Sequence, residues 1–211
     1  MNTFEQGLLR YFTAGMLAKI QSVKIGIAGA GGLGSNCAQL LVRSGFKKFK
    51  IVDFDCVDYS NLNRQFYFLH QVAKPKAQML RENLRQINPD VEIDIVQAKI
   101  DENNINGLFG DCDVVVEAVD RAEYKKMIVE HYLSSGKLLV AASGLAGWGD
   151  SDRIRVHKIK DNFYLVGDLT TASGPACPPV APCVNIAAAK QADVILNWVL
   201  GPIKKGETSR G

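Results

Sequence analysis

The sequence has 211 residues, of which 47% are hydrophobic and 22% are charged. A chain of this length and composition can bury one good-sized core, so we expect one main domain. Its 25 basic and 22 acidic residues give a formal net charge of +3, which is too small and too dispersed to indicate a nucleic-acid partner or a polybasic membrane contact. Apolar runs stay short of a membrane span, and the five cysteines contain no C-x-x-C pair, so we expect a soluble protein in the reduced cytoplasm.

The first 22 residues predict an N-terminal helical segment. Apolar side chains recur there at helical spacing, at Leu9, Phe12, Met16 and Ile20, and charged residues interrupt the run that a signal peptide would need. We expect this segment to precede a single domain over residues 23–200, followed by a flexible tail over 201–211.

Strands and helices alternate from residue 23 onward. An apolar, β-branched strand at 23–28 leads into a glycine turn, a helix and a second strand at 48–53, which together form a βαβ unit. The elements that follow are a helix at 75–88, strands at 91–96 and 114–116, a helix at 122–133 and a strand at 138–142. This alternation predicts an α/β, Rossmann-like three-layer fold: a mostly parallel sheet with helices on both faces.

The pattern changes after Gly144. Apolar residues alternate at 154–159 and again at 164–166 around a polar turn, which predicts an antiparallel hairpin that extends the sheet. A stretch rich in glycine and proline at 174–182 then leads into an alanine-rich final helix ending near Leu200.

A glycine-rich turn lies between the first strand and the first helix of this domain. Gly29, Gly31 and Gly34 satisfy the G-x-G-x-x-G pattern, with Gly32 inside it, so backbone N–H groups and the helix N-terminus can face a phosphate. The alternative is a tight turn that only packs helix against strand. Asp53 closes the second strand where a carboxylate accepts hydrogen bonds from a ribose, and to this point an NAD(P)-dependent oxidoreductase explains the sequence equally well.

The loop after the second strand favours another chemistry. Asn61 and Arg64 are three residues apart, so a helical turn puts an amide and a guanidinium on one side, where they can hold triphosphate oxygens. Lys76, on the first turn of the next helix, would add a second cation. Asp55 and Gln65 crowd the same loop, and a dehydrogenase has no need for this set. The alternative for Arg64 and Lys76 is ordinary surface charge.

Asp120 follows the strand at 114–116. It therefore emerges at the carboxyl edge of the sheet together with Asp53 and Asp55, where open α/β sheets bind ligands. A magnesium or ribose role is open to it there. A helix N-cap is the alternative, since a helix starts two residues later at Ala122.

Six motifs in chain order resemble the ThiF/MoeB/HesA family, bacterial relatives of the ubiquitin-activating enzymes. They are Gly-Ala-Gly-Gly-Leu-Gly-Ser (29–35), Val-Asp-Phe-Asp (52–55), Ser-Asn-Leu-Asn-Arg-Gln (60–65), Lys-Pro-Lys (74–76), Ile-Asn-Pro (87–89) and Ala-Val-Asp (118–120). The resemblance runs from about Val23 to Leu200. The compact length and the Ala-Ser-Gly-Leu-Ala-Gly stretch (142–147) look most like the short ThiF-type members associated with thiamine biosynthesis.

The resemblance implies an ATP-dependent adenylyltransferase. The terminal glycine carboxylate of a carrier attacks the α-phosphorus of ATP, pyrophosphate leaves and an acyl adenylate remains. The implied partner is a small β-grasp sulfur-carrier protein of the ThiS type that ends in Gly-Gly, and the implied assembly is a homodimer. Within this class, the alternatives are a MoaD-like carrier, a small molecule or a tRNA.

The resemblance also implies roles for individual residues. Arg64, Lys76 and Mg²⁺ would steady the phosphates, Asn61 would orient them, Asp53 would bind ribose and Asp120 would act near the metal. In this family an arginine from the N-terminal helix of a second subunit often reaches the nucleotide. Arg10 is the candidate here, and a plain amphipathic surface helix is the alternative.

Cysteine use departs from the family pattern. Many relatives bind structural zinc through paired C-x-x-C motifs, which this sequence lacks, so we predict no zinc site. Some ThiF proteins also use a cysteine before the last helix to form a covalent link with the carrier. Cys177 and Cys183 fall in that segment, and placement in a loop favours Cys177 as the nucleophile. The alternative is that both thiols are inert.

Overall fold

The sheet is built outward from the buried strand β1 (Lys24–Ala28) in the computed structural model, which describes residues 1–203. Parallel neighbours flank it, β2 (Lys48–Val52) on one side and β4 (Val114–Glu117) on the other. The full strand order is β3-β2-β1-β4-β5-β7-β6. The outer parallel strands are β3 (Glu92–Val96) and β5 (Leu138–Ala142).

The predicted hairpin extends this sheet on the β5 side. β7 (Phe163–Gly167) runs parallel to β5, and β6 (Arg155–Lys160) pairs with β7 in the antiparallel sense at the edge. After β5 the chain first forms the edge strand β6 and then returns to place β7 between β6 and β5. The sheet is therefore mixed, as the alternation after Gly144 predicts.

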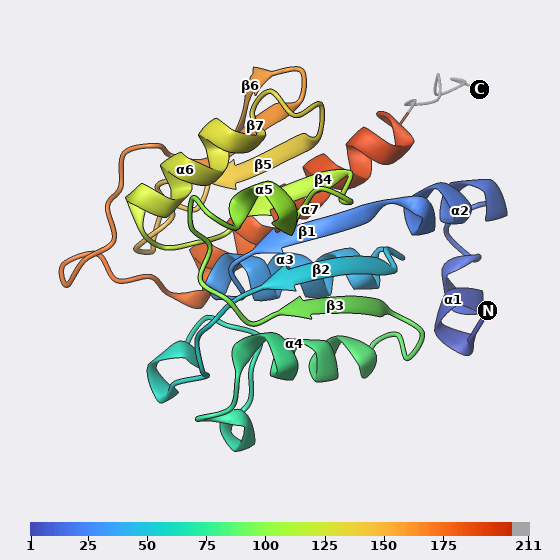
Figure 1. Cartoon of the computed structure of the whole chain (residues 1–211), viewed down its shortest axis with the longest axis horizontal. Coiled ribbons are helices and arrows are strands. Elements are labelled where there is room, and N and C mark those ends of the chain that lie inside the picture. Colours follow the sequence, from blue (N-terminus) through green and yellow to red (C-terminus); the bar gives the residue numbers. More distant parts are fainter. Residues whose placement is uncertain (204–211) are drawn as a thin grey trace, which may run out of the picture.

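Helices cover both faces of the sheet (Figure 1). Alternate strand residues enter different cores: Val114 and Val116 belong to the larger core, and Val115 to the smaller one. Strands covered on both sides are typical of parallel sheets, so the predicted Rossmann-like α/β fold is confirmed. The larger core packs under α3 (Gly32–Arg43), α4 (Lys76–Arg85) and α7 (Ala181–Leu200), and the smaller one under α5 (Ile105–Leu108) and α6 (Ala122–Tyr132).

The N-terminal segment forms two helices, α1 (Thr3–Leu8) and α2 (Ala14–Ser22). The hydroxyl of Thr13 accepts a hydrogen bond of 3.2 Å from the backbone N–H of Met16, so a new helix starts inside the apolar repeat. Periodicity alone did not reveal this break. No helix within residues 1–203 is long and apolar enough to cross a bilayer. The tail expected over 201–211 lies outside the described residues from position 204 on.

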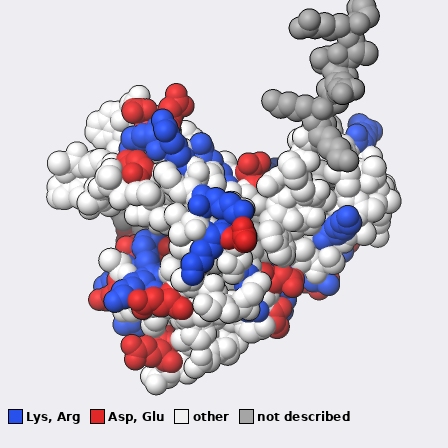
Figure 2. Space-filling view, turned by 90° about the horizontal axis from the view of Figure 1, so that it is seen from above, with Lys and Arg blue, Asp and Glu red and all other residues white. Residues whose placement is uncertain are grey.

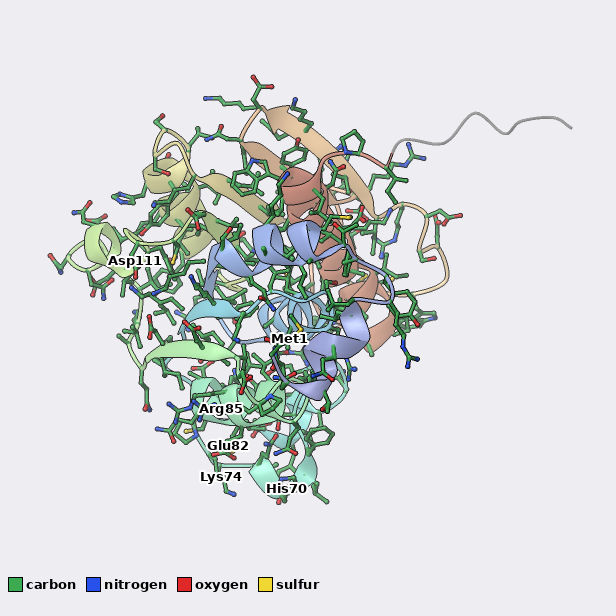
Figure 3. All side chains as sticks on the ribbon, turned by 90° about the vertical axis from the view of Figure 1, so that its right-hand side faces the viewer. Met1, His70, Lys74, Glu82, Arg85 and Asp111 are labelled. Carbon is green, nitrogen blue, oxygen red and sulfur yellow. The ribbon has the colours of Figure 1, made fainter. Side chains whose placement is uncertain are left out.

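Ion pairs occupy the amino edge of the sheet. Lys24 contacts the carboxylates of Asp94 and Asp111 at 2.6 and 2.7 Å, and Lys50 contacts Asp111 at 2.6 Å. Figure 3 views this side of the molecule, where Met1 and the N-terminal helices also lie. Lysines and arginines are interspersed with acidic residues on the face shown in Figure 2, in keeping with the small net charge.

Candidate active site

A cleft of about 500 Å³ opens at the carboxyl ends of the parallel strands. It lies at β1 and β4, where the strand order reverses and the following loops diverge to opposite sides. Loops from several strands therefore converge on one cavity. Its walls contain the following residues singled out from the sequence: Gly29, Gly31, Gly32, Asp53, Asp55, Arg64, Gln65, Lys76 and Asp120.

The four glycines of the turn serve two purposes. Gly29 has a φ of +95°, and a Cβ there would lie 2.8 Å from the carbonyl oxygen of Ala118, while a Cβ at Gly34 would lie 1.8 Å from the carbonyl oxygen of Gly29. These two glycines let α3 pack directly against the strands. Gly31 and Gly32 line the cleft. No side chain caps the start of α3, which leaves its first N–H groups available to an anion.

Asp53 fixes the shape of this turn. Its Oδ2 accepts a hydrogen bond of 2.6 Å from the backbone N–H of Ala30, and its Oδ1 accepts one of 2.8 Å from that of Asp55. Burial raises the pKa of Asp53, although both N–H donors oppose the shift. The carboxylate is thus already engaged with the backbone, and a ribose would have to use its remaining lone pairs.

Contacts within the protein fix the position of Lys76 in the cleft. Its Nζ lies 2.9 Å from Oδ2 of Asp55, and its backbone N–H donates to the carbonyl oxygen of the same residue at 2.9 Å. The hydroxyl of Tyr67 donates to the carbonyl oxygen of Ala30 at 2.7 Å and lies 3.3 Å from that of Lys76, which links the start of α4 to the glycine turn. The predicted cation therefore has a defined position beside the turn.

Arg64 lies over the first turn of α3. Its Cγ is 3.6 Å from where a Cβ would stand on Gly32, so the aliphatic stem packs against the glycine. Its Nη1 donates to the carbonyl oxygen of Ser60 at 3.0 Å and to Oδ1 of Asn63 at 2.7 Å. A guanidinium has five N–H donors, so this anchoring leaves others for a phosphate.

Asn61 does not line the cleft. Its Oδ1 accepts a hydrogen bond of 3.0 Å from the backbone N–H of Asp58, as part of a capping box at the 3₁₀ turn η1 (Tyr59–Asn61). The amide oxygen of Asn61 thus caps its own turn, and a role for Asn61 in orienting the triphosphate stays a prediction. Gln65 does face the cleft, and its amide oxygen is buried without a hydrogen-bond partner among the described residues. Such an oxygen is suited to accept from a ligand.

Asp120 is exposed and lines the cleft. Arg121 occupies the N-cap position of α6, so the alternative that Asp120 caps this helix is wrong. Proteins commonly hold Mg²⁺ through one or two carboxylates together with phosphate oxygens, and the exposed carboxylate of Asp120 in the cleft wall fits that pattern. No group of three or more His, Cys, Asp or Glu side chains within residues 1–203 is arranged to hold a metal by protein atoms alone.

An ion pair between a cleft residue, Lys125, and a buried glutamate behind it was missed from the sequence. The carboxylate of Glu117, at the end of β4, is buried and lies 2.9 Å from Nζ of Lys125 on α6. Burial raises the pKa of Glu117, and Lys125 opposes this shift. The available signal was a glutamate at the end of a run of valines, with a lysine eight residues later.

A hydrogen-bond network around Arg153, which was also not predicted from the sequence, connects two loops in one wall of the cleft. The guanidinium of Arg153 bonds the carboxylate of Asp168, the hydroxyl of Thr171 and the carbonyl oxygen of Ala146. Thr171 and Ala146 both line the cleft, so this one side chain joins the loop after β5 to the loop after β7. The three acceptors lie 15, 18 and 7 residues from Arg153 in sequence, which hides the network from any local pattern.

Three further candidates, Cys177, Cys183 and Arg10, are not part of the cleft wall. Cys177 is half-buried, and its loop folds back through a pair of backbone hydrogen bonds with Gly174, of 3.0 and 3.1 Å. Cys183 is buried in the first turn of α7. Arg10 is exposed in the segment between α1 and α2, and these two helices lie beside the amino ends of the strands (Figure 1).

Comparison with known proteins agrees with this geometry. The sequence model of the ThiF family matches residues 5–210. The adenylyltransferase and sulfurtransferase UBA4 of Candida glabrata is 28% identical over 198 residues, covering 87% of this chain and 44% of that protein. The sulfur carrier protein ThiS adenylyltransferase of Bacillus subtilis is 34% identical over 121 residues, covering 56% of this chain and 36% of that protein. The chain thus spans less than half of either relative.

A solved structure shows the same fold. The structure of E. coli tRNA N6-threonylcarbamoyladenosine dehydratase, TcdA, in complex with AMP, has a TM-score of 0.82 to this chain at 20% identity. The match covers 92% of both chains. The sheet order and the helical layers described above therefore recur in a protein whose structure contains a bound nucleotide.

Proposed function

Because the chain belongs to the ThiF family, we propose that it is an ATP-dependent adenylyltransferase, which activates a carboxylate as an acyl adenylate. The observation that carries this proposal is the convergence of Arg64 and Lys76 with the glycine turn on one cleft. An NAD(P)-dependent oxidoreductase would also use the glycine turn and Asp53, but that function would not explain why Arg64 and Lys76 line the same cleft. The cleft therefore favours a triphosphate over a dinucleotide.

The chemistry demands charge neutralisation more than proton transfer. An oxygen of the substrate carboxylate bonds to the α-phosphorus, the bond from that phosphorus to the bridging oxygen breaks, and pyrophosphate leaves with the electron pair. No proton has to move, so positioned cations and N–H donors supply the stabilisation. Arg64, Lys76 and the start of α3 present such groups to the cleft. Gln65 adds an amide whose oxygen is free to accept a hydrogen bond.

The other side chains of the cleft suit the remaining parts of the nucleotide. We assign Asp120 to Mg²⁺, which would neutralise phosphate charge when bound. Asp53 and Asp55 lie at the end of β2, where a ribose is commonly held. Of these two, Asp55 is the more exposed, so it is better placed to accept a ribose hydroxyl directly.

We infer that the substrate is the C-terminal glycine of a small sulfur-carrier protein of the ThiS type. The motif resemblance and the relative named ThiS adenylyltransferase support this choice. A homodimer and roles for Arg10 across its interface and for Cys177 as a covalent acceptor belong to the same proposal. Several relatives are named tRNA threonylcarbamoyladenosine dehydratase, so a tRNA whose modified nucleoside carries a carboxylate is the second candidate.

Exchange of labelled pyrophosphate into ATP tests the proposal, because it requires formation of the adenylate. We expect exchange to depend on a carrier that ends in Gly-Gly and to disappear with the same carrier lacking its last glycine. Exchange that depends instead on tRNA bearing threonylcarbamoyladenosine would select the second candidate. Tight binding of NAD in calorimetry, with no binding of ATP, would overturn the assignment of the cleft to adenylation.

A further inference from the structure

The ion pair between Glu117 and Lys125 lies next to the cleft and is not needed to bind phosphate. Glu117 ends β4, and its side chain is 1% exposed. Lys125 projects from α6, lines the cleft and approaches both carboxylate oxygens of Glu117, at 2.9 and 3.1 Å. A charge buried to this degree is costly unless it is paired, so each partner stabilises the other in place.

The ammonium of Lys125 is fully engaged within the protein. Besides the two oxygens of Glu117, it donates to the carbonyl oxygen of Ala142, at the end of β5, at 3.1 Å. An ammonium has three N–H donors, and these three contacts use all of them. Lys125 therefore joins the carboxyl ends of β4 and β5 and has no donor left for a phosphate. This distinguishes it from Arg64 and Lys76, which sit beside the glycine turn.

The same carboxylate also shapes the turn that follows β4. Oε1 of Glu117 accepts a hydrogen bond of 3.0 Å from the backbone N–H of Val119, the residue before Asp120. The path from Lys125 through Glu117 and Val119 thus ends at the carboxylate assigned to Mg²⁺. Groups that orient a metal-binding side chain in this way commonly change metal affinity when they are removed.

We propose that Glu117 and Lys125 are positioning residues that hold Asp120 in the orientation needed to bind a metal–nucleotide complex. This inference rests on the proposed function. Neither residue touches the nucleotide. The pair acts by fixing the turn after β4 against the end of β5, so its loss should reduce the affinity for magnesium-bound ATP much more than the affinity for ATP alone.

Calorimetric titrations with ATP, in magnesium and in EDTA, test this assignment. For Lys125→Met we expect affinity in magnesium to fall about tenfold, as for other residues that orient metal ligands, and affinity in EDTA to stay within about twofold. Lys125→Arg keeps a cation able to reach Glu117 and should recover most of the affinity. Lys126→Met is the matched control, since Lys126 is the exposed neighbour on α6 and forms only an i,i+4 pair.

A double-mutant cycle with Asp120→Asn separates positioning from a general loss of structure. If Lys125 acts through Asp120, Lys125→Met should add little to the loss of magnesium-dependent affinity that Asp120→Asn causes alone. If Lys125→Met does not fold, the neutral pair Glu117→Gln with Lys125→Gln replaces it. The same loss is expected there, because an amide cannot supply the three donors of Lys125.

Three results would overturn the inference. One is unchanged affinity for magnesium-bound ATP in Lys125→Met or in the neutral pair. Another is an equal loss in magnesium and EDTA, which would make Lys125 a phosphate ligand. The third is full additivity with Asp120→Asn. Failure of the proposed function would look different, because the unmutated protein would then bind no ATP and catalyse no pyrophosphate exchange.

Discussion

Lys76 and Asp55 form an ion pair in the wall of the cleft, with Nζ and Oδ2 2.9 Å apart. The two partners differ in exposure: the lysine side chain is 8% exposed, and that of the aspartate is 49% exposed. The lysine is therefore the fixed member, held by its packing, and the aspartate remains open to solvent. A bound polyphosphate would meet a cation that is already in place and has no large reorganisation to make.

Replacing Lys76 by methionine should lower pyrophosphate exchange by about 10²–10³-fold, the usual effect of removing one fixed donor from a transition state. Methionine keeps much of the buried volume, and Asp55 can be hydrated, so the melting temperature should change little. Lys74→Met is the matched control, because Lys74 is exposed two residues earlier. Equal exchange by the two variants would contradict the assigned role of Lys76.

Arg64→Ala should weaken ATP binding and exchange, because the guanidinium lies over the first turn of α3. Arg64→Lys should restore only part of the loss, since an ammonium cannot reproduce the planar fork that binds phosphate in two places. Arg43→Ala at the exposed far end of the same helix is the control. Affinity for ATP, measured by calorimetry, should be highest for the native protein, lower for Arg64→Lys and lowest for Arg64→Ala. Loss in Arg43→Ala of similar size would show a general electrostatic effect instead.

Gly34→Ala should destabilise the fold by about 1–3 kcal/mol, the usual cost of overpacking, because the new Cβ would lie 1.8 Å from the carbonyl oxygen of Gly29. Gly15→Ala, in α2, is the matched control. A Cβ there meets nothing within 4 Å, so alanine should be neutral or stabilising by up to about 1 kcal/mol. Urea unfolding of both variants measures the contrast, and a stable Gly34→Ala protein would show that α3 can shift away from the strand.

Asp168→Asn should destabilise the protein in a pH-dependent way. Burial alone would raise the pKa of Asp168, but hydrogen bonds from Thr171, Thr170 and Arg153 outweigh burial and hold this pKa below its ordinary range. A carboxyl with a lowered pKa in the folded state stabilises that state above its unfolded pKa of about 3.9, and the contribution is lost as the pH falls through the folded value. The free energy of unfolding is the quantity to compare.

At pH 7, the free energy of unfolding of the native protein should exceed that of Asp168→Asn by about 1–3 kcal/mol, because the amide replaces one acceptor oxygen by an NH₂ group that faces other donors. The difference should shrink as the pH is lowered below about 4. Asp161→Asn serves as a control, since the carboxyl of Asp161 is fully exposed, and its effect should be small at every pH. A difference that is constant between pH 7 and pH 3 would rule out the ionised carboxylate as the source of the stability.

Much of the architecture was predictable because it depends on local patterns. Apolar runs of strand length and helical repeats alternate along the chain, and a parallel sheet covered on both faces is the arrangement that buries them all. The glycine turn was predictable from its spacing. The structure gives the reason for two of the glycines, since a Cβ at Gly29 or Gly34 would collide with the backbone. The break between α1 and α2 was not, since one hydroxyl at Thr13 interrupts an otherwise regular repeat.

Which residues reach the carboxyl edge of the sheet follows from local sequence, because strand ends and the turns after them depend on neighbours in the chain. Which of these side chains share the cleft depends on long-range packing. Tertiary structure turned Asn61 into a cap, buried Lys76 against Asp55, and paired Lys125 with Glu117. The physical reason is that a side chain's direction and desolvation depend on segments distant in sequence, whose approach only the packed sheet brings about.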